Sequence, residues 1–387
     1  MKDYRFLQRK YSVNTYPDRG LTFVKGEGPY LIDESDEHYL DLMTNYGVNI
    51  FGYNHPTIVN RLKHQVEHLT TLHGSFNNDV RALAAKVLVN RCGGGVSRVY
   101  LSNSGAEAIE AALKFAVLAS GKKKFICCRN NYHGKTLGAL SASDNKKYKA
   151  PFEPLLWDFH PIEFNNLQQL ENTIDDQVGA FLVEPIQGEG GINVPDSDYI
   201  RRAKQICEAN GVLMILDEIQ TGMGRTGFFL ASHMDKMSYD LVCIGKGLAG
   251  GIPIGATLVS EGIASKISKA IHTSTFGGNP LAGAGILATL ELLDDALLSR
   301  VLKIGSHFLK VLRQIPSDLI TQIKGKGLML GIDLAMKRDE VLRNLQKEKI
   351  LAIPAADNVV RFLPPYILEE KHVDKIADAL ERIFTTL

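Results

Sequence analysis

Two short apolar runs, each leading to an ionisable residue, constrain the fold of this chain more than any other feature. Residues 212–216 lead directly to Asp217, and residues 241–244 lead through Gly245 to Lys246. Such runs are typical of strands buried on both faces of a parallel sheet, whose ligands bind beyond the carboxyl ends of the strands. A buried lysine at that edge can form a Schiff base with an aldehyde, and a buried carboxylate can keep a pyridine nitrogen protonated. Together the two residues predict a pyridoxal-phosphate enzyme.

Composition places the chain among globular enzymes and argues against several other classes. Of its 387 residues, 45% are hydrophobic and 22% are charged, and the length favours two domains. A net charge of +1 argues against nucleic acid or an anionic membrane as a partner. No apolar stretch approaches the roughly 20 residues of a membrane span. Because the first residues also lack the apolar core of a signal peptide, we expect a cytoplasmic protein.

The five cysteines are odd in number and lie mostly in apolar runs. The adjacent pair Cys127 and Cys128 has no second pair at metal-ligand spacing. The pattern therefore predicts buried thiols, with neither a metal site nor disulfides.

The pattern of apolar residues divides the chain into an amino-terminal segment (1–45), a large domain (46–285) and a small domain (286–387). In the large domain, short apolar runs alternate with helical stretches, of which 106–119 is the clearest. The strands expected there are 99–102, 124–128, 180–183, 212–216, 241–244 and 256–259. This alternation favours an α/β fold in which helices cover both faces of a large, mostly parallel sheet.

The flanking parts carry shorter signals. The amino-terminal segment predicts a hairpin, 23–25 with 29–32, and a further strand at 39–42, and we expect it to pack with the small domain. In the small domain the expected helices are 287–297, 301–315, 339–347 and 370–384, and the expected strands are 328–334, 351–354 and 359–363. That mixture predicts a small α+β domain.

Two stretches contain residues suited to holding a phosphate. Ser104, Gly105 and Ala106 follow a predicted strand and open a helix, where backbone amides and a hydroxyl can form an anion site. An ordinary helix cap would use the same residues, so this motif is weak by itself. Ser274 and Thr275 precede two glycines and a proline, a pattern that a simple turn also explains.

Two further strand ends carry candidate site loops. Tyr132 and His133 follow one predicted strand, and an aromatic ring there can stack on a flat cofactor. Core packing and a hydrogen bond to a loop carbonyl are the plain alternatives for these two residues. Glu184 and Glu189 follow another strand within a glycine-rich loop, although Glu184 alone would also fit a strand-end salt bridge.

Gly222, Gly224 and Gly227 match G-x-G-x-x-G, the dinucleotide-binding pattern. That site requires the first glycine in the turn directly after the strand, and a helix that opens within the motif. Here residues 217–221 intervene, and two phenylalanines follow in place of a helix start. We therefore exclude a nicotinamide cofactor.

Seven motifs make the chain resemble the class III aminotransferases of fold type I, and most of all the acetylornithine/ornithine aminotransferases. The motifs extend from about Tyr16 to Pro365, in family order and at family spacing. The most specific are LMILDEIQTGMGRTG and IGKGLAGGIPIGA; the others are SGAEA, YHGKTLGALS, VEPIQGEGG, STFGGNPLA and VVRFLPP. The resemblance implies a large, mostly parallel sheet domain, a smaller α+β domain, and pyridoxal 5'-phosphate as the cofactor.

The resemblance also implies roles for individual residues. Lys246 would bind the cofactor covalently and shuttle a proton, and Asp217 would pair with the pyridine nitrogen. Gln220 would hydrogen-bond the phenolic oxygen, and Tyr132 would stack on the ring. The remaining cofactor contacts would come from Ser104, Gly105, Ala106, His133, Glu184 and, across a homodimer with shared sites, Thr275.

Three substrate contacts follow from the same resemblance. Arg361 would bind a substrate carboxylate. Glu189 would pair with Arg361 while the amino donor is bound, which masks the charge of the arginine. Ser274 would contact the substrate.

Three more positions bear on the choice of substrate. Lys135 stands where the family usually has arginine, and lysine cannot make a two-pronged carboxylate contact. Tyr16 and Tyr46 match the ornithine type. The short chain and the stretches NKKYKAPFEPLL and VVRFLPPY instead resemble the acetylornithine and lysine-biosynthesis branch.

The resemblance therefore implies transfer of a terminal amino group to 2-oxoglutarate by a ping-pong mechanism. N-acetylornithine, a substrate of arginine biosynthesis, is the expected donor. Ornithine and the carrier-linked aminoadipate semialdehyde of lysine biosynthesis are alternatives. An aminomutase on the same fold would need no acceptor, and the presence of both Lys246 and Asp217 argues against a non-catalytic scaffold.

Overall fold

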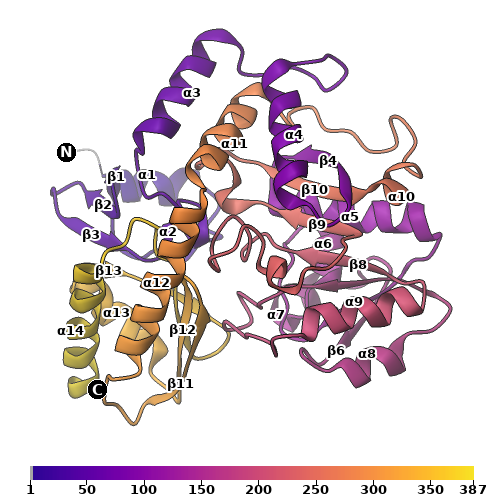
Figure 1. Ribbon diagram of the computed structural model, residues 1–387. Helices are drawn as coiled ribbons and strands as arrows, with labels where there is room; N and C mark the ends of the chain where they lie inside the picture. The colour runs from indigo at the N-terminus through magenta and orange to yellow at the C-terminus, as the bar shows by residue number, and fades with distance from the viewer. Residues whose placement is uncertain (1–2) are drawn as a thin grey trace.

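A seven-stranded sheet lies at the centre of the computed structural model, which describes residues 3–387 (Figure 1). Its strands are β4 (Val96–Ser102), β5 (Lys124–Cys128), β6 (Asp158–Ile162), β7 (Val178–Val183), β8 (Leu213–Asp217), β9 (Leu241–Ile244) and β10 (Gly255–Ser260). The strand order is β4-β10-β9-β8-β7-β5-β6. Strand β10 runs antiparallel to β9 and β4, and the pairs from β9 to β6 are parallel. All strands except β6 lie at predicted positions; β6 was not predicted, and it is an edge strand that contains Pro161, a place where a sheet tolerates proline.

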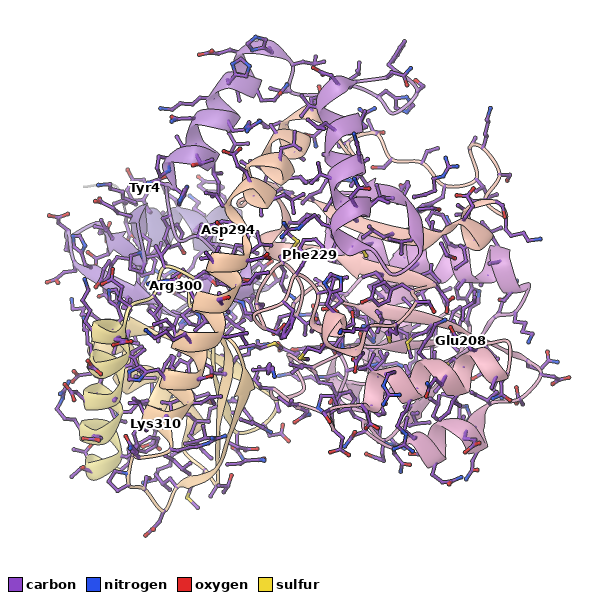
Figure 2. All side chains as sticks on the ribbon, viewed as in Figure 1. Tyr4, Glu208, Phe229, Asp294, Arg300 and Lys310 are labelled. Carbon is purple, nitrogen blue, oxygen red and sulfur yellow. The ribbon has the colours of Figure 1, made fainter. Side chains whose placement is uncertain are left out.

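Alternate residues of the central strands enter two separate hydrophobic cores. Met214 and Leu216 of β8 belong to one core, together with residues of helix α9 (Tyr199–Ala209). Ile215, between them, belongs to the other core, which includes helix α5 (Gly105–Ser120). Side chains fill the space between the sheet and its helices (Figure 2). The expected burial of both sheet faces is therefore confirmed.

Helix α5 begins and ends one residue outside the predicted range of 106–119. At its start the Ser104 hydroxyl accepts a hydrogen bond from the backbone N–H of Glu107 at 3.2 Å. At its end Gly121 adopts a left-handed φ of 74°, a conformation that suits glycine. The helix start thus faces the edge of the sheet where β4 ends.

The amino-terminal segment forms the expected hairpin, β1 (Phe23–Glu27) with β2 (Tyr30–Asp33), followed by β3 (His38–Asp41). Helix α1 (Tyr4–Tyr11) was not predicted, and none of its residues is buried. Strand β3 pairs in parallel with β13 (Ile350–Leu351), which supports the expected packing with the small domain. The division at residues 45 and 285 stays a prediction, and residues 1 and 2 of its first part lie outside the described residues.

The structure corrects the first two helices of the carboxyl-terminal part. Helix α11 (Pro280–Leu292) begins seven residues before the predicted 287, because Asn279 caps its first turn and Pro280 occupies a position where proline is favoured. Helix α12 (Asp295–Leu312) begins after the cap Asp294, six residues before the predicted 301. Polar capping residues, not the apolar pattern, set both boundaries.

A four-stranded sheet of order β11-β12-β15-β14 forms the core of the small domain. Its elements are β11 (Ile320–Lys326), β12 (Met329–Leu334), α13 (Arg338–Lys347), β14 (Ile353–Ala355), β15 (Val359–Phe362) and α14 (Glu370–Thr386). Strand β11 was not predicted; it contains Gly325, and glycine inside a strand weakens the strand pattern. The predicted run 351–354 is divided between β13 and β14.

The remaining elements are short connections and covering helices. They are α2 (Thr44–Gly47), α3 (Pro56–His68), α4 (Asp79–Cys92), α6 (Leu137–Ala142), α7 (Lys146–Lys149), α8 (Leu167–Thr173), α10 (Glu261–Ala264), η1 (Ala150–Phe152), η2 (Ala231–Asp235) and η3 (Lys246–Ala249). The glycine-rich stretch after Asp217 leads to the 3-10 helix η2 and opens no α-helix, which agrees with our exclusion of a dinucleotide site. The thiols of all five cysteines are buried, as predicted. None of the helices within residues 3–387 has the length and apolar character that a membrane crossing requires.

Gly305 tests the contact between α12 and the loop before β12. A methyl group on Gly305 would collide with the backbone carbonyl of Gly327. We expect Gly305→Ala to lower the stability of the protein by about 1–3 kcal/mol, because neither backbone can yield easily. Gly262→Ala is the matched control, since a methyl group on that helical glycine meets nothing within 4 Å. Thermal unfolding measures both; equal midpoints for the two variants would contradict the proposed close contact.

Candidate active site

A cavity of about 210 Å³ lies beyond the carboxyl ends of β7 and β8, beside the start of α5. Its lining comprises Gly105, Ala106, Tyr132, His133, Gly134, Lys135, Glu184, Glu189, Asp217, Ile219, Gln220 and Lys246. Most of the sequence-predicted site residues thus meet in one place. This is the edge of the parallel sheet where a ligand was expected.

Asp217 and His133 form a buried pair at the floor of the cavity. Asp217 is 4% exposed, and its Oδ2 lies 2.7 Å from Nδ1 of His133. Its Oδ1 accepts a hydrogen bond from the backbone N–H of Ile219 at 3.0 Å. Nε2 of His133 is buried and has no hydrogen-bond partner among the described residues. These contacts orient the carboxylate, and Asp217 also lines the cavity, where a further donor can reach it.

Glu184 joins two of the cavity loops through the backbone. Its carboxylate accepts hydrogen bonds from the N–H groups of Tyr132 and Gly188, each at 3.0 Å. Burial raises the pKa of Glu184 to about 7, an effect opposed by the neighbouring His133. None of the ion pairs among residues 3–387 includes Glu184, so a strand-end salt bridge does not explain it. Its contacts instead hold the loops after β5 and β7 in place.

Lys246 follows β9, and the half-buried residue lines the cavity. Its φ is 47°, a left-handed conformation that is unusual for lysine and that redirects the chain at the end of the strand. A methyl group on Gly47 would lie 3.9 Å from Cδ of Lys246, so the lysine stem passes close to α2. Burial lowers the pKa of Lys246, and Asp217 opposes this shift. A larger fraction of neutral amine makes this lysine a better nucleophile.

The start of α5 provides free backbone amides beside the lysine. Gly105 and Ala106 line the cavity at the first turn of the helix, where N–H groups and the helix dipole favour an anion. A methyl group on Gly105 would approach the Ile219 side chain to 2.8 Å, so glycine is required here by space. Ser104 caps this helix, because its hydroxyl accepts a hydrogen bond from the N–H of Glu107. A helix cap was the alternative to a phosphate contact that the sequence left open for this residue.

Arg361 enters the site from β15 of the small sheet. Its side chain is 0% exposed and lies 2.7 Å from the carboxylate of Glu189, whose side chain is 32% exposed. Arg361 also donates to Oε1 of Gln220 at 3.2 Å, and its guanidinium lies 5.6 Å from the ring centre of Tyr46. A second wall of the site is therefore built by the small domain.

Tyr46 belongs to a strained turn. Thr44, Asn45 and Tyr46 have φ values of 47°, 52° and 59°, all left-handed. The Thr44 hydroxyl donates to the carbonyl of Leu363 at 2.6 Å, which ties this turn to the chain after β15. Such strain persists only where surrounding contacts enforce it, and it is characteristic of functional sites.

Six sequence-predicted residues do not line the cavity: Ser104, Tyr46 and Arg361, described above, and Tyr16, Ser274 and Thr275. Tyr16 is 87% exposed and lines a separate hollow formed by the amino-terminal segment. Ser274 accepts hydrogen bonds from Nδ2 of Asn103 at 3.1 Å and from the N–H of Gly277 at 2.9 Å. Thr275 is exposed on the surface. The single chain therefore does not bring the side chains of Tyr16, Ser274 and Thr275 to Lys246.

The sequence interpretation overlooked two lining residues, Ile219 and Gly134. Ile219 lies two positions after Asp217, and this spacing was the available signal because alternate residues share a side of an extended chain.

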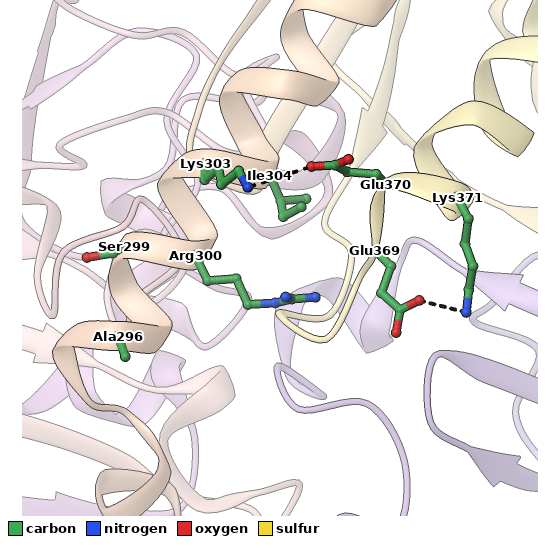
Figure 3. Close-up of a pocket in the computed structure, with 8 residues that line it drawn as sticks. All are labelled: Ala296, Ser299, Arg300, Lys303, Ile304, Glu369, Glu370 and Lys371. Carbon is green, nitrogen blue, oxygen red and sulfur yellow. Dashed lines mark ion pairs between the residues drawn. The ribbon is translucent and has the colours of Figure 1, made fainter.

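A separate hollow of about 600 Å³ lies between α12 and the start of α14 (Figure 3). Its lysines are paired, Lys303 with Glu370 and Lys371 with Glu369, and it does not contribute to the site.

The residues of the cavity match the parts of pyridoxal phosphate. A lysine of lowered pKa suits the aldehyde, and a buried carboxylate that lines the cavity suits a protonated pyridine nitrogen. The amides of Gly105 and Ala106, at the first turn of α5 and in the cavity lining, suit the phosphate. Fold and site together define a pyridoxal-phosphate-dependent enzyme of fold type I.

Comparisons with known proteins agree with this assignment. The family model "Aminotransferase class-III" matches residues 11–384. The [LysW]-aminoadipate semialdehyde/glutamate semialdehyde transaminase of Sulfurisphaera tokodaii is 39% identical and covers 96% of both chains. The acetylornithine aminotransferase of Methanopyrus kandleri is 36% identical over 98% of this chain and 99% of its own. The crystal structure of the ornithine aminotransferase from Toxoplasma gondii ME49 superimposes with a TM-score of 0.95, at 33% identity, over 99% of this chain and 94% of its own.

The chain belongs to the class III aminotransferases. A second structure of the Toxoplasma gondii ornithine aminotransferase shows partial occupancy of pyridoxal phosphate at its active site. The enzyme therefore uses an amino donor and a keto-acid acceptor, with pyridoxal phosphate as its cofactor.

Asp217→Asn tests the electrostatic role of the buried carboxylate. An amide keeps the shape but cannot supply the negative charge that holds a proton on a pyridine nitrogen. We expect the single-turnover rate with donor to fall at least about a hundredfold, since breaking a buried ion pair costs about 3–5 kcal/mol. Cofactor affinity, measured by titration, should fall much less. Asp175→Asn, which removes the exposed partner of Lys124 outside the cavity, should leave the rate near normal; equal losses of rate and affinity at Asp217 would mean a structural role.

Proposed function

We propose that this enzyme moves the terminal amino group of an ω-amino donor to 2-oxoglutarate in two half-reactions that share one pocket. The ion pair between Arg361 and Glu189 carries the proposal. Because Arg361 is buried, it needs a carboxylate partner at all times. Because Glu189 is partly exposed, it can turn away when an acceptor brings its own carboxylate. One pocket can therefore serve a donor with the pair closed and a dicarboxylate acceptor with the pair open.

The residues around Lys246 supply the proton transfers. When bound, pyridoxal phosphate accepts the amino group at its aldehyde carbon and withdraws electrons from the carbon that loses a proton. Nζ of Lys246, with its lowered pKa, would take the proton from the substrate carbon that carries the amino group and deliver it to the former aldehyde carbon, on the other side of the nitrogen. Asp217, held by His133, keeps the ring nitrogen protonated.

Four other residues would hold and orient the cofactor. The amides of Gly105 and Ala106 would bind its phosphate. Tyr132 would lie against the ring, and the neutral phenol fits that role since burial raises the pKa of Tyr132 to about 12. Gln220 uses Oε1 for Arg361, which leaves its Nε2 to donate to the phenolic oxygen.

N-acetylornithine is the donor that we propose first. Similarity to acetylornithine aminotransferases over nearly the whole chain supports this donor. Two other donors are supported by separate observations. Ornithine is supported by Tyr46 beside Arg361 and by the structural similarity to the Toxoplasma gondii ornithine aminotransferase. The carrier-linked aminoadipate semialdehyde is supported by the Sulfurisphaera tokodaii transaminase at 39% identity. A role in arginine biosynthesis and a cytoplasmic location stay predictions.

A homodimer with shared sites completes the proposal. Thr275 and Ser274 belong to a surface segment with large exposed apolar side chains, Ile271 at 47% and Phe276 at 58%. A second copy covering this segment would bury those side chains and place Thr275 near the neighbouring phosphate site. Sedimentation during dilution, with cofactor content measured in parallel, tests this, because dimer and bound cofactor should then decline together.

A donor panel tests the reaction. We expect N-acetylornithine, ornithine and carrier-linked donor to be converted in that order of kcat/KM, and only when 2-oxoglutarate is present for repeated turnover. Lys246→Ala should lower the rate by several orders of magnitude while the fold survives. The control is Lys310→Ala, which removes an exposed lysine of α12 and should change nothing. Turnover without an acceptor would instead indicate an aminomutase.

Lys135 tests how the acceptor is bound. Lysine attracts a carboxylate but lacks the planar fork of arginine, so Lys135→Arg should raise kcat/KM for 2-oxoglutarate. Lys135→Ala should lower it roughly ten- to over a hundredfold, since a charge-assisted hydrogen bond contributes about 1.5–3 kcal/mol. Lys146→Ala, which removes an equal charge from nearby α7, is the control. If kcat/KM for 2-oxoglutarate changes by less than about twofold in both Lys135 variants, Lys135 is a solvent-exposed loop residue that does not contact the acceptor.

A further inference from the structure

The Lys135 side chain rests on an aromatic ring at the mouth of the cavity. Its Nζ lies 4.3 Å from the ring centre of Tyr148, within the range of a cation–π contact. Lys135 is exposed and lines the cavity. An exposed lysine has a flexible four-carbon stem and ordinarily moves among many rotamers. The ring therefore restricts a cation that would otherwise be free to move.

Tyr148 is itself well anchored. Its backbone N–H donates to the side chain of Asn145 at 3.3 Å, which caps α7, and Lys149 of the same turn donates to the carbonyl of Ser141 at 2.9 Å. The Tyr148 ring meets the ring of Tyr132 edge-on, with centres 6.4 Å apart and planes at 75°. Tyr148 is thus a half-buried platform placed against the cavity wall.

Lys135 shares the cavity with a competing carboxylate, Glu189, but forms no ion pair with it. Glu189 lines the same cavity and pairs with Arg361 at 2.7 Å, and no ion pair of Lys135 occurs among residues 3–387. If Lys135 moved to Glu189, its charge would be neutralised and Arg361 would lose its partner. An aromatic face attracts an ammonium without neutralising it, because the ring carries no net charge.

We propose that Tyr148 is a positioning residue for Lys135: its ring holds the ammonium at the cavity mouth, away from Glu189 and ready for a substrate carboxylate. This inference rests on the proposed function, in which Lys135 contacts that carboxylate. This contact also explains how a flexible lysine at position 135 can bind a substrate carboxylate, a role for which the planar guanidinium of an arginine would need no aromatic neighbour. The specificity of the site then depends on a side chain of α7 that does not contact the reacting atoms.

Calorimetric binding of glutarate, an unreactive five-carbon dicarboxylate, tests the inference on the enzyme with cofactor. We expect Tyr148→Leu to weaken glutarate about two- to fivefold, because a cation–π contact at an exposed site contributes about 0.5–1 kcal/mol. Tyr148→Phe keeps an aromatic face and should stay within about 1.5-fold of the parent. The KM for 2-oxoglutarate should change in parallel. If Tyr148→Leu does not fold, Tyr148→Met provides the same comparison.

The Lys135→Ala variant distinguishes a failure of the inference about Tyr148 from a failure of the proposed carboxylate contact of Lys135. In that background Tyr148→Leu should have no further effect on glutarate binding, since the cation on which the ring acts is gone. A loss of similar size in both backgrounds would overturn the positioning role. If Lys135→Ala weakens binding and Tyr148→Leu does not, only the inference about Tyr148 is wrong. If Lys135→Ala itself leaves binding unchanged, the carboxylate contact in the proposed function is wrong.

Discussion

The active site depends on a buried negative charge at the end of β8. Removing the Asp217 carboxylate from water is costly, and the structure offsets that cost with His133 and the N–H of Ile219. These partners orient the carboxylate, and Asp217 also lines the cavity. Placing His133 there requires the loop after β5 to lie beside β8, and Glu184 secures that loop through the N–H of Tyr132. The parallel order β8-β7-β5 brings these three strand ends together.

Two pairs of oppositely charged residues lie in different parts of the site. The Lys246 amine, next to Asp217, has a lowered pKa because burial outweighs the nearby carboxylate. Arg361 approaches from the small sheet and is neutralised by Glu189. The cavity therefore combines a nucleophilic amine at its floor with an adjustable positive charge at its wall. Such a division allows substrates of different charge to react at one lysine.

The small domain contributes a side chain to the site and also holds a neighbouring turn in place. Arg361 belongs to β15, and the chain after β15 fixes the left-handed turn at Thr44 through Leu363. Tyr46 in that turn faces Arg361, and Gly47 lies beside the stem of Lys246. Segments from the beginning, middle and end of the sequence thus meet at one point. The strain of the turn is maintained by this packing.

The apolar runs and glycine motifs of the sequence determined the parallel sheet, helix α5 and the positions of Asp217 and Lys246, because buried strands and helix starts require those residue types locally. Family spacing also indicated Arg361 and Glu189. Local pattern did not reveal edge strand β6, with its Pro161, or the capped start of α11 at Pro280. Nor did it reveal the resting place of Lys135 on Tyr148, since contacts between loops depend on how distant segments pack. Whether Glu184 is paired, and how far burial shifts its pKa, was decided only by the tertiary structure, because desolvation is a property of the assembled interior.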